Sequence, residues 1–357
     1  MRLNTQNRSM LATHIIWGCV IFCLIAIVGD IPLAAQEQRL SDNLFEFLEK
    51  EIDLSKGELN SVRGGRVVTK KLDTDVKQEV AMFSIARINV PADKFLAEYG
   101  KDTFSIELAK AESWGLFSMP PKPEDVRELA VPSTDIDELK KSNVGDSKVK
   151  GPLELLDAFR QLDDSASDYQ QQADAIFQRE LLKYAQNYVQ QGNAGLIEYR
   201  DKENPIKVAE EFQDILKQSP YLDTYMPELR PYLEQYPNSE LPDATSRLFW
   251  MIENFGGQAK RPTISINHFV MYQPKDGEMI AASKQLYANH YYEAALGLTV
   301  MVKDPENPGS AIYLMHISRT RIDALREVPK FLAGDLYKGA EDLLDEKMTI
   351  IKEEMEK

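Results

Sequence analysis

Three histidines lie in the last hundred residues of the chain, at His268, His290 and His316. Histidine is the commonest metal ligand and a general base near neutral pH, so these positions suggest either zinc binding or proton transfer. In the antiparallel register that the turns predict, His268 pairs with Lys284 and His316 pairs with Leu296. His290 then lies about 20 Å along the strand from Lys284, at ~3.3 Å per residue. Because zinc ligands lie within ~2.3 Å of the ion, this spacing predicts no metal site.

Taken one at a time, the histidines have simpler interpretations. His268 and His316 alternate with isoleucine and leucine along their strands, which predicts core histidines with hydrogen-bond partners. His290 precedes two tyrosines at a strand end, where we expect solvent to be near. If one histidine is functional, a buried imidazole near Lys284 or Arg319 is suited to act as a general base or to bind the polar head of a ligand.

Motifs that identify enzymes by sequence are missing from this chain. It contains no His-Glu-x-x-His, no Gly-x-Ser-x-Gly and no glycine-rich phosphate loop. Ser147 to Lys150 matches Ser-x-x-Lys but without the companion motifs of the enzymes that use it. The sequence therefore predicts no catalytic residue and no cofactor. The formal charge of −15 also argues against nucleic acid as a partner, because binding to phosphates needs clustered Lys and Arg.

The first 35 residues have the three-part pattern of a secretory signal peptide. Arg2 and Arg8 precede an apolar run from Ile15 to Val28, and small residues follow at Ala34 and Ala35. A retained membrane anchor is the alternative, but the run is shorter than the ~20 residues that span a bilayer. We expect export to the bacterial periplasm or medium, with no stable membrane span after cleavage.

Cleavage after residue 35 also removes Cys19 and Cys23, the only cysteines in the chain. The exported protein then has no disulfide and no thiol chemistry, unlike many small secreted domains. Its stability must come from an apolar core, and a chain of this length is long enough to form one.

The order of elements predicts an α+β fold. Residues 36–150 contain strands and helices, 151–258 read as a helical insertion, and 259–357 read as an antiparallel meander followed by one long helix. The strands expected are 66–72, 79–90, 263–272, 279–289, 295–303 and 311–320, with a possible strand at 144–149. The terminal helix carries an apolar face whose members are Leu332, Leu336, Ala340, Leu344, Met348, Ile351 and Met355.

The last strand is apolar on both faces. Ile312 and Leu314 point to one side, while Tyr313, Met315 and Ile317 point to the other. Such a strand must be covered twice, here by the terminal helix and by part of the helical middle. A packed core explains this pattern, and so does a ligand cavity between sheet and helix.

Two stretches carry a family resemblance. Ala86–Gly100 (ARINVPADKFLAEYG) and the region from Thr263 to the end resemble the START and polyketide-cyclase-like (SRPBCC, helix-grip) superfamily. The chain as a whole also looks like secreted bacterial proteins. The superfamily resemblance implies an antiparallel sheet gripping a long C-terminal helix, with an apolar ligand held between them. Since members of that superfamily include binders, cyclases and hydrolases, the fold does not choose among these activities.

We therefore expect an exported, non-catalytic protein that binds an apolar small molecule or lipid. The alternatives are a hydrolase or cyclase that uses a buried histidine of the same cavity, and an envelope interaction protein that uses the Tyr- and Pro-rich stretch 219–237. The residues expected to line the ligand site are His268, Lys284, Tyr287, Tyr313, Met315, His316 and Arg319.

Overall fold

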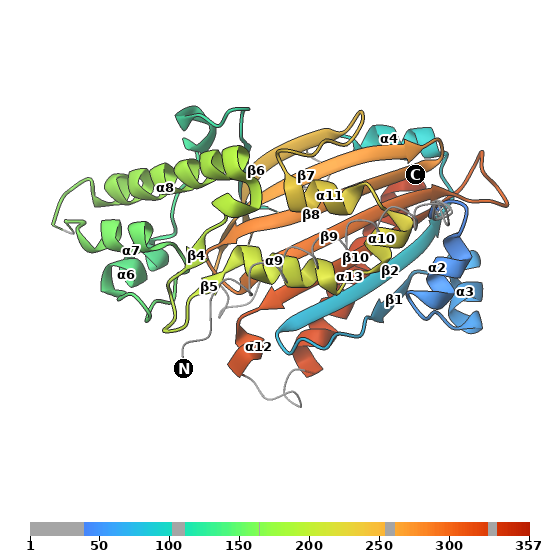
Figure 1. Ribbon diagram of the computed structural model, residues 1–357, viewed down its shortest axis with the longest axis horizontal. Coiled ribbons are helices and arrows are strands. Elements are labelled where there is room, and N and C mark those ends of the chain that lie inside the picture. Colours follow the sequence, from blue (N-terminus) through green and yellow to red (C-terminus); the bar gives the residue numbers. More distant parts are fainter. Residues whose placement is uncertain (1–38, 102–110, 164, 254–260, 328–333) are drawn as a thin grey trace, which may run out of the picture. The chain divides into compact units, whose positions relative to one another are not determined.

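The computed structural model describes residues 39–101, 111–163, 165–253, 261–327 and 334–357. The expected signal peptide lies outside these residues. Within them the chain is mixed α and β, with eleven α-helices, an antiparallel sheet of eight strands and a separate pair of short strands (Figure 1). No helix in this described part has the length and apolar character needed to cross a bilayer.

The strands of the large sheet follow the order β1-β2-β10-β9-β8-β7-β6-β3. Their bounds are β1 Val68–Lys71, β2 Glu79–Ile88, β3 Ser113–Leu116, β6 Thr245–Glu253, β7 Thr263–Lys275, β8 Glu278–Ala288, β9 Tyr292–Lys303 and β10 Ile312–Ile322. The predicted four-strand meander is confirmed as β7 to β10. Its first turn needs Gly277, whose φ of 83° is disfavoured for residues with a Cβ.

The prediction of a helical stretch up to residue 258 is wrong at its end, because β6 belongs to the sheet. In β6, Leu248 and Trp250 pack into one core cluster while Phe249 and Met251 pack into another. A strand that is apolar on both faces has no two-residue alternation, so its sequence resembles a buried helix. The possible strand at 144–149 does not form; only isolated bridges occur there, at Asn143 and Asp146.

Eight of the helices and the short strand pair form two groups on the sheet. The first group contributes to a core with β6 and the ends of β7 and β8, and comprises α6 Ser133–Lys141, α7 Leu153–Arg160, α8 Tyr169–Gln191, β4 Glu198–Tyr199 and β5 Ile206–Lys207. The second group packs over the middle of the sheet, and comprises α2 Leu44–Lys50, α3 Lys56–Arg63, α9 Val208–Lys217, α10 Tyr221–Tyr225 and α11 Leu229–Gln235.

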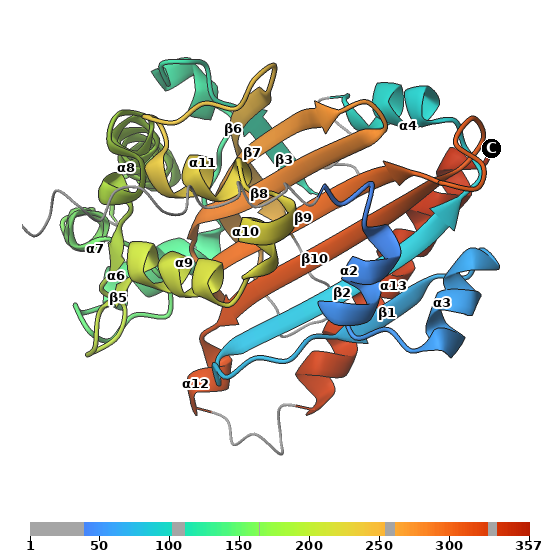
Figure 2. The same ribbon diagram turned by 45° about the vertical axis from the view of Figure 1, so that its right-hand side comes forward.

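The two faces of β10 are covered by different elements, as the sequence predicted. Tyr313, Met315 and Ile317 pack in the cluster that holds α2 and α9 to α11, whereas Ile312 and Leu314 pack with residues of α4 (Ala92–Tyr99) and α13 (Gly334–Met355). Figure 2 shows α2, α9 and α10 in front of the sheet and α13 behind it.

The C-terminal helix α13 lies along β1 and β2 and is anchored mainly through its second half. Met348 and Met355 are its buried residues, and Leu336 near its start is 41% exposed. Polar contacts reinforce the second half: Lys352 Nζ donates to the Arg87 carbonyl at 3.0 Å, and the Asn89 amide donates to Glu356 at 2.8 Å. Leu332, expected on the apolar face of this helix, lies outside the described residues.

Candidate functional site

A cavity of about 200 Å³ lies between the sheet and α13. Its walls are mainly apolar and come from α4, five strands and α13. The lining residues are Tyr99, Phe249, Phe269, Ala281, Ser283, Gly297, Thr299, Leu314, His316, Leu344, Lys347, Met348 and Ile351. The space is partly open to solvent, and its apolar walls make it a distinct feature of this face of the sheet. We call it the apolar pocket.

A glycine in the middle of β9 makes room for a side chain that lines this pocket. A Cβ added at Gly297 would lie 3.3 Å from Cε1 of His316, closer than side chains normally pack. A glycine inside a strand weakens the strand and often marks a place where another group approaches closely. Here that group is the imidazole of His316, which occupies the space over Gly297.

Of the titratable residues that line the apolar pocket, His316 is the one that comes from the sheet. Its Nδ1 lies 3.0 Å from the Thr299 hydroxyl, and within the described part of the chain its Nε2 makes no hydrogen bond. Burial, assisted by the positive charge of Lys347, lowers the pKa of His316 to about 4. The imidazole is therefore neutral at pH 7 and offers Nε2 to the cavity as either a donor or an acceptor.

A second, more polar pocket of about 310 Å³ adjoins the first. The two share His316, Leu344 and Lys347. The other residues that line this polar pocket are Val80, Met82, Glu253, Gln285, Tyr292, Ala295, Ser318, Thr320, Ile322, Ala340 and Leu343. Burial raises the pKa of Glu253 to about 7, although Lys347 opposes the shift. Near neutral pH this carboxyl is thus divided between its neutral and charged forms.

Of the seven residues expected to line the ligand site, only His316 lines these pockets. Tyr313 and Met315 alternate with it along β10 and are buried on the opposite face of the sheet. Arg319 points to that opposite face too, and its guanidinium donates to Glu79 at 2.6 Å. Together with Arg321, which lies 3.1 Å from the same carboxylate, it forms a buried ion cluster.

His268 and Lys284 face each other across β7 and β8, as the register predicted. His268 is buried, with the Tyr188 hydroxyl 2.8 Å from Nδ1 and the Ser246 hydroxyl 2.9 Å from Nε2. Lys284 bonds to Asn193 and lies 4.0 Å from the centre of the Phe212 ring. Burial lowers the pKa of Lys284 to about 7, and burial together with Lys284 lowers that of His268 to about 3. This confirms the interpretation of His268 as a core histidine with partners.

Tyr287 belongs to the core beneath α8. Its side chain is fully buried, and its hydroxyl donates to the Lys150 carbonyl at 2.8 Å. Its ring lies 6.3 Å from that of Tyr184 on α8. The structure therefore separates it from the pockets beneath α13.

Two expectations about the histidines need correction. His290 is 4% exposed, with Nε2 2.9 Å from Asp135 and Nδ1 3.1 Å from the Lys148 carbonyl, because the segment before α7 covers the end of β8. His316 pairs with Thr299 and not with Leu296, because the turn between β9 and β10 is centred about one and a half residues later than expected. Among the described residues no group of His, Cys, Asp and Glu is arranged to hold a metal ion.

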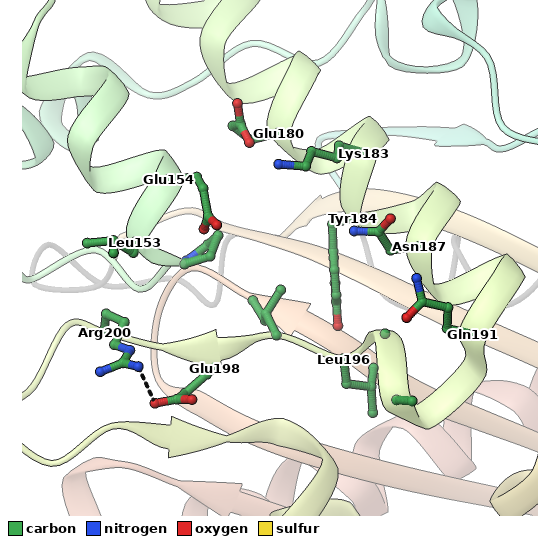
Figure 3. A pocket seen from close by; sticks show the side chains of 14 residues that line it. Leu153, Glu154, Glu180, Lys183, Tyr184, Asn187, Gln191, Leu196, Glu198 and Arg200 are labelled. Atoms are coloured by element: carbon green, nitrogen blue, oxygen red, sulfur yellow. Dashed lines mark ion pairs between the residues drawn. The ribbon is translucent and has the colours of Figure 1, made fainter.

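Another pocket, of about 400 Å³, opens between α7, α8 and β4. Figure 3 shows Glu154 from α7 and Lys183 from α8 lining it, with the ion pair between Arg200 and Glu198 on the β4 side. Its charged side chains include both signs, and Glu154 and Lys183 are exposed to solvent. This opening does not enclose an apolar surface, so it fits the expected ligand less well than the space beneath α13.

Sequence reasoning missed the residues that most define the apolar and polar pockets. Lys347 is not a member of the apolar face predicted for the terminal helix, yet it lines both pockets together with Leu344 three residues earlier. Glu253 ends a strand that was not expected. Gly297 was the available signal, since a single glycine inside an otherwise aliphatic strand indicates a close approach.

Comparison with known proteins adds nothing to this geometry. No family model, no curated protein and no solved structure matches the chain.

Proposed function

We propose that this is an exported, non-catalytic protein that binds an apolar or lipid-like ligand in the space between the sheet and α13. The observation that carries the proposal is the apolar pocket, whose walls include Phe249 and Phe269 from the sheet and Met348 from the helix. Ligand sites are characteristically concave, mostly apolar and furnished with a few polar groups. The apolar pocket has this composition, with His316 and Lys347 as polar groups.

The size of the space supports the same proposal. Small-molecule pockets measure roughly 300–1,000 Å³. The apolar and polar pockets measure about 200 and 310 Å³ and share three residues, so a ligand that extends from one into the other has room in that range.

The placement of α13 supports a helix-grip arrangement of the START-like kind. The meander β7 to β10 precedes this helix in the chain, with the short helix α12 (Ala324–Glu327) between them, and α13 packs on one face of the same sheet. In that arrangement the ligand lies between the helix and the sheet, where the apolar pocket is. Export rests on the apolar run and small residues within positions 1–35.

A hydrolase remains the second candidate, because one observation favours it. Ser246 is exposed, its hydroxyl lies 2.9 Å from Nε2 of buried His268, and Tyr188 holds Nδ1 of the same ring. A serine bonded to an oriented histidine is the arrangement of a nucleophile and its base. The pKa of about 3 for His268 opposes this role, since so weak a base does not take the serine proton near neutral pH. Labelling by a fluorophosphonate that is lost in Ser246→Ala would favour the hydrolase.

The interaction-protein alternative depended on exposed tyrosines in stretch 219–237. Tyr221, Tyr225 and Tyr232 are buried and Tyr236 is partly buried, packed against the cores. Side chains that already fill the interior are not offered to a partner.

The proposal is tested with N-phenyl-1-naphthylamine, an uncharged probe whose fluorescence rises in apolar surroundings. We expect saturable binding at one site, and we expect mass spectrometry of organic extracts of the purified protein to show a co-purifying amphiphile. Absence of both the saturable signal and an extracted compound would remove the proposal.

A further inference from the structure

The sheet side of the polar pocket contains a row of paired residues whose middle member is small. Gln285 on β8 pairs with Ala295 on β9, and Ala295 pairs with Thr320 on β10. All three residues line the polar pocket. Because neighbouring strands lie about 4.8 Å apart, the backbones of Gln285 and Thr320 are about 10 Å from each other. A group placed over the methyl of Ala295 therefore meets an amide on one side and a hydroxyl on the other.

This pocket contains hydrogen-bonding groups that the protein does not use. Four of its polar side chains make no hydrogen bond to any other residue that the structure describes: Glu253, Gln285, Ser318 and Thr320. Oε1 of Gln285 is moreover buried, with no donor to it from the same described residues. A buried acceptor without a donor costs free energy. A ligand that donates a hydrogen bond to this oxygen removes that cost.

The wall opposite these polar groups is largely apolar. Beside Lys347, α13 contributes Ala340, Leu343 and Leu344 to it, and Leu343 is 44% exposed. A molecule in this pocket must therefore offer hydrogen-bonding groups toward the sheet and C–H groups toward the helix. Polyols and sugars have this character, because their hydroxyls project from the edges of a carbon skeleton whose faces carry C–H groups.

The charges of the polar pocket favour a head group without net charge. Glu253 and Lys347 both line it, and the positive charge of Lys347 acts on Glu253. An anionic head would meet Glu253 and a cationic head would meet Lys347, and like charges repel more strongly in a partly buried site than in water. A zwitterionic phosphocholine head avoids a net charge but has no donor for Oε1 of Gln285. A hydroxylated head meets both requirements.

We propose that the ligand is a single-chain amphiphile with a neutral, hydroxylated head, whose hydroxyls bond to Gln285, Ser318 and Thr320 while its alkyl chain fills the apolar pocket. The apolar and polar pockets share His316 and Leu344, so one molecule can occupy both. This inference rests on the proposed function and goes further by naming the class of head group and the residues that select it.

The experiment measures displacement of N-phenyl-1-naphthylamine from the purified protein by six ligands with the same ten-carbon chain, each below its micelle-forming concentration. These are decyl glucoside, monodecanoylglycerol, decanol, decylphosphocholine, decanoate and decyltrimethylammonium. We expect the two hydroxylated ligands to displace the probe at least about 10-fold more effectively than decanol, because each added hydrogen bond strengthens binding a few-fold. The charged and zwitterionic ligands should not exceed decanol. The stronger hydroxylated ligand then shows whether the site prefers a sugar or a glycerol head.

Variants of similar side-chain size test the assigned residues. Gln285→Met and Thr320→Val should each reduce the preference for decyl glucoside over decanol at least about threefold, while decanol and probe binding stay within about twofold. Ser283→Ala is the control, since this serine precedes Gln285 by two residues on β8 and lines only the apolar pocket of the two. It should leave the preference unchanged. Circular dichroism shows that each variant is folded.

The outcomes separate this inference from the proposed function. If the probe binds but the hydroxylated ligands are no better than decanol, or if a charged or zwitterionic ligand exceeds them, the hydroxylated head is disproved and the apolar site stands. The same holds if folded Gln285→Met and Thr320→Val keep the full preference. If neither the probe nor decyl glucoside binds, with the glucoside measured directly by calorimetry, both proposals fail.

Discussion

At the scale of single residues, Glu253 and Lys347 give the polar pocket charges of both signs. Lys347 opposes the rise in the pKa of Glu253, yet burial still raises that pKa to about 7. Two other titratable groups of this pocket, Tyr292 and His316, do not change charge near pH 7. Burial raises the pKa of Tyr292 far above neutrality, and it lowers that of His316 to about 4. Glu253 is therefore the group whose ionisation changes the charge of the site near neutral pH.

The raised pKa of Glu253 predicts how the stability of the protein depends on pH. Because burial raises this pKa from 4.5 to about 7, the folded protein binds the proton more tightly than the unfolded chain does, and this stabilisation is lost as the pH rises through about 7. We expect the free energy of unfolding to be lower at pH 8 than at pH 5, and we expect Glu253→Gln to reduce the difference. Urea unfolding at both pH values measures it, and an unchanged difference in Glu253→Gln would contradict the assignment.

Strand β10 shows how far the positions of single residues could be predicted from the sequence. The alternation of the strand placed His316 and Leu314 on one side and Tyr313 and Met315 on the other, which the structure confirms. Which side holds the cavity depends on the elements that cover each face, and alternation within one strand carries no information about them. For that reason most of the expected site residues are in the core of the opposite face.

At the scale of elements, β9 is the strand whose sequence opens the apolar pocket. Its neighbours on this face, Ala295 and Thr299, each carry a Cβ, and Gly297 leaves the space that the ring of His316 occupies. We expect Gly297→Leu to reduce binding of N-phenyl-1-naphthylamine at least about 10-fold, since the new side chain occupies the floor of the pocket. Fluorescence titration measures this loss.

Gly309→Leu is the matched control, because a Cβ at that position meets no atom within 4 Å. It should bind the probe normally. Circular dichroism and thermal unfolding of Gly297→Leu show whether the sheet is retained. Normal probe binding by a folded Gly297→Leu protein would mean that the probe lies elsewhere.

The uneven burial of α13 gives a second prediction for an element. Met355 is 3% exposed and packs against the sheet, whereas Leu336 is 41% exposed. Met355→Ala should lower the free energy of unfolding by about 2–4 kcal/mol, and Leu336→Ala by about 0.5 kcal/mol. Urea unfolding measures both values. Equal losses would show that the helix is not anchored through its second half.

The elements themselves were predictable where local signals are strong. The turn residues around Gly277 and the long apolar strands predicted β7 to β10 within a few residues of their observed bounds. The strand β6 was not predicted. In β6 both faces are buried, so the period that distinguishes strand from helix is absent.

At the scale of the whole molecule, the proposed export determines the compartment in which the protein binds its ligand. We predict that the full chain, expressed in a bacterium with a periplasm, appears outside the cytoplasm with a new amino terminus at Gln36. Cell fractionation followed by amino-terminal sequencing measures both properties. A cytoplasmic or membrane-retained protein that still begins at residue 1 would contradict the prediction.

The sheet has more strands than the sequence predicted, because some of its strands pair with strands that are distant in the sequence. The meander accounts for four strands, but β2 pairs with β10, and β6 and β3 extend the other edge. Short turns reveal which consecutive strands pair, whereas a contact between distant segments leaves no pattern in either one. The α+β class was therefore predictable, and the eight-strand order was not.

The pairing of β2 with β10 bears on how the chain folds while it is being made. Arg319 and Glu79, which join these strands, are 240 residues apart in sequence. Contacts between residues so far apart in sequence form slowly, and Glu79 cannot meet Arg319 until nearly the whole polypeptide has left the ribosome. The sheet therefore cannot be completed until its last strand has been made, which is compatible with the proposed passage of the chain across a membrane before folding.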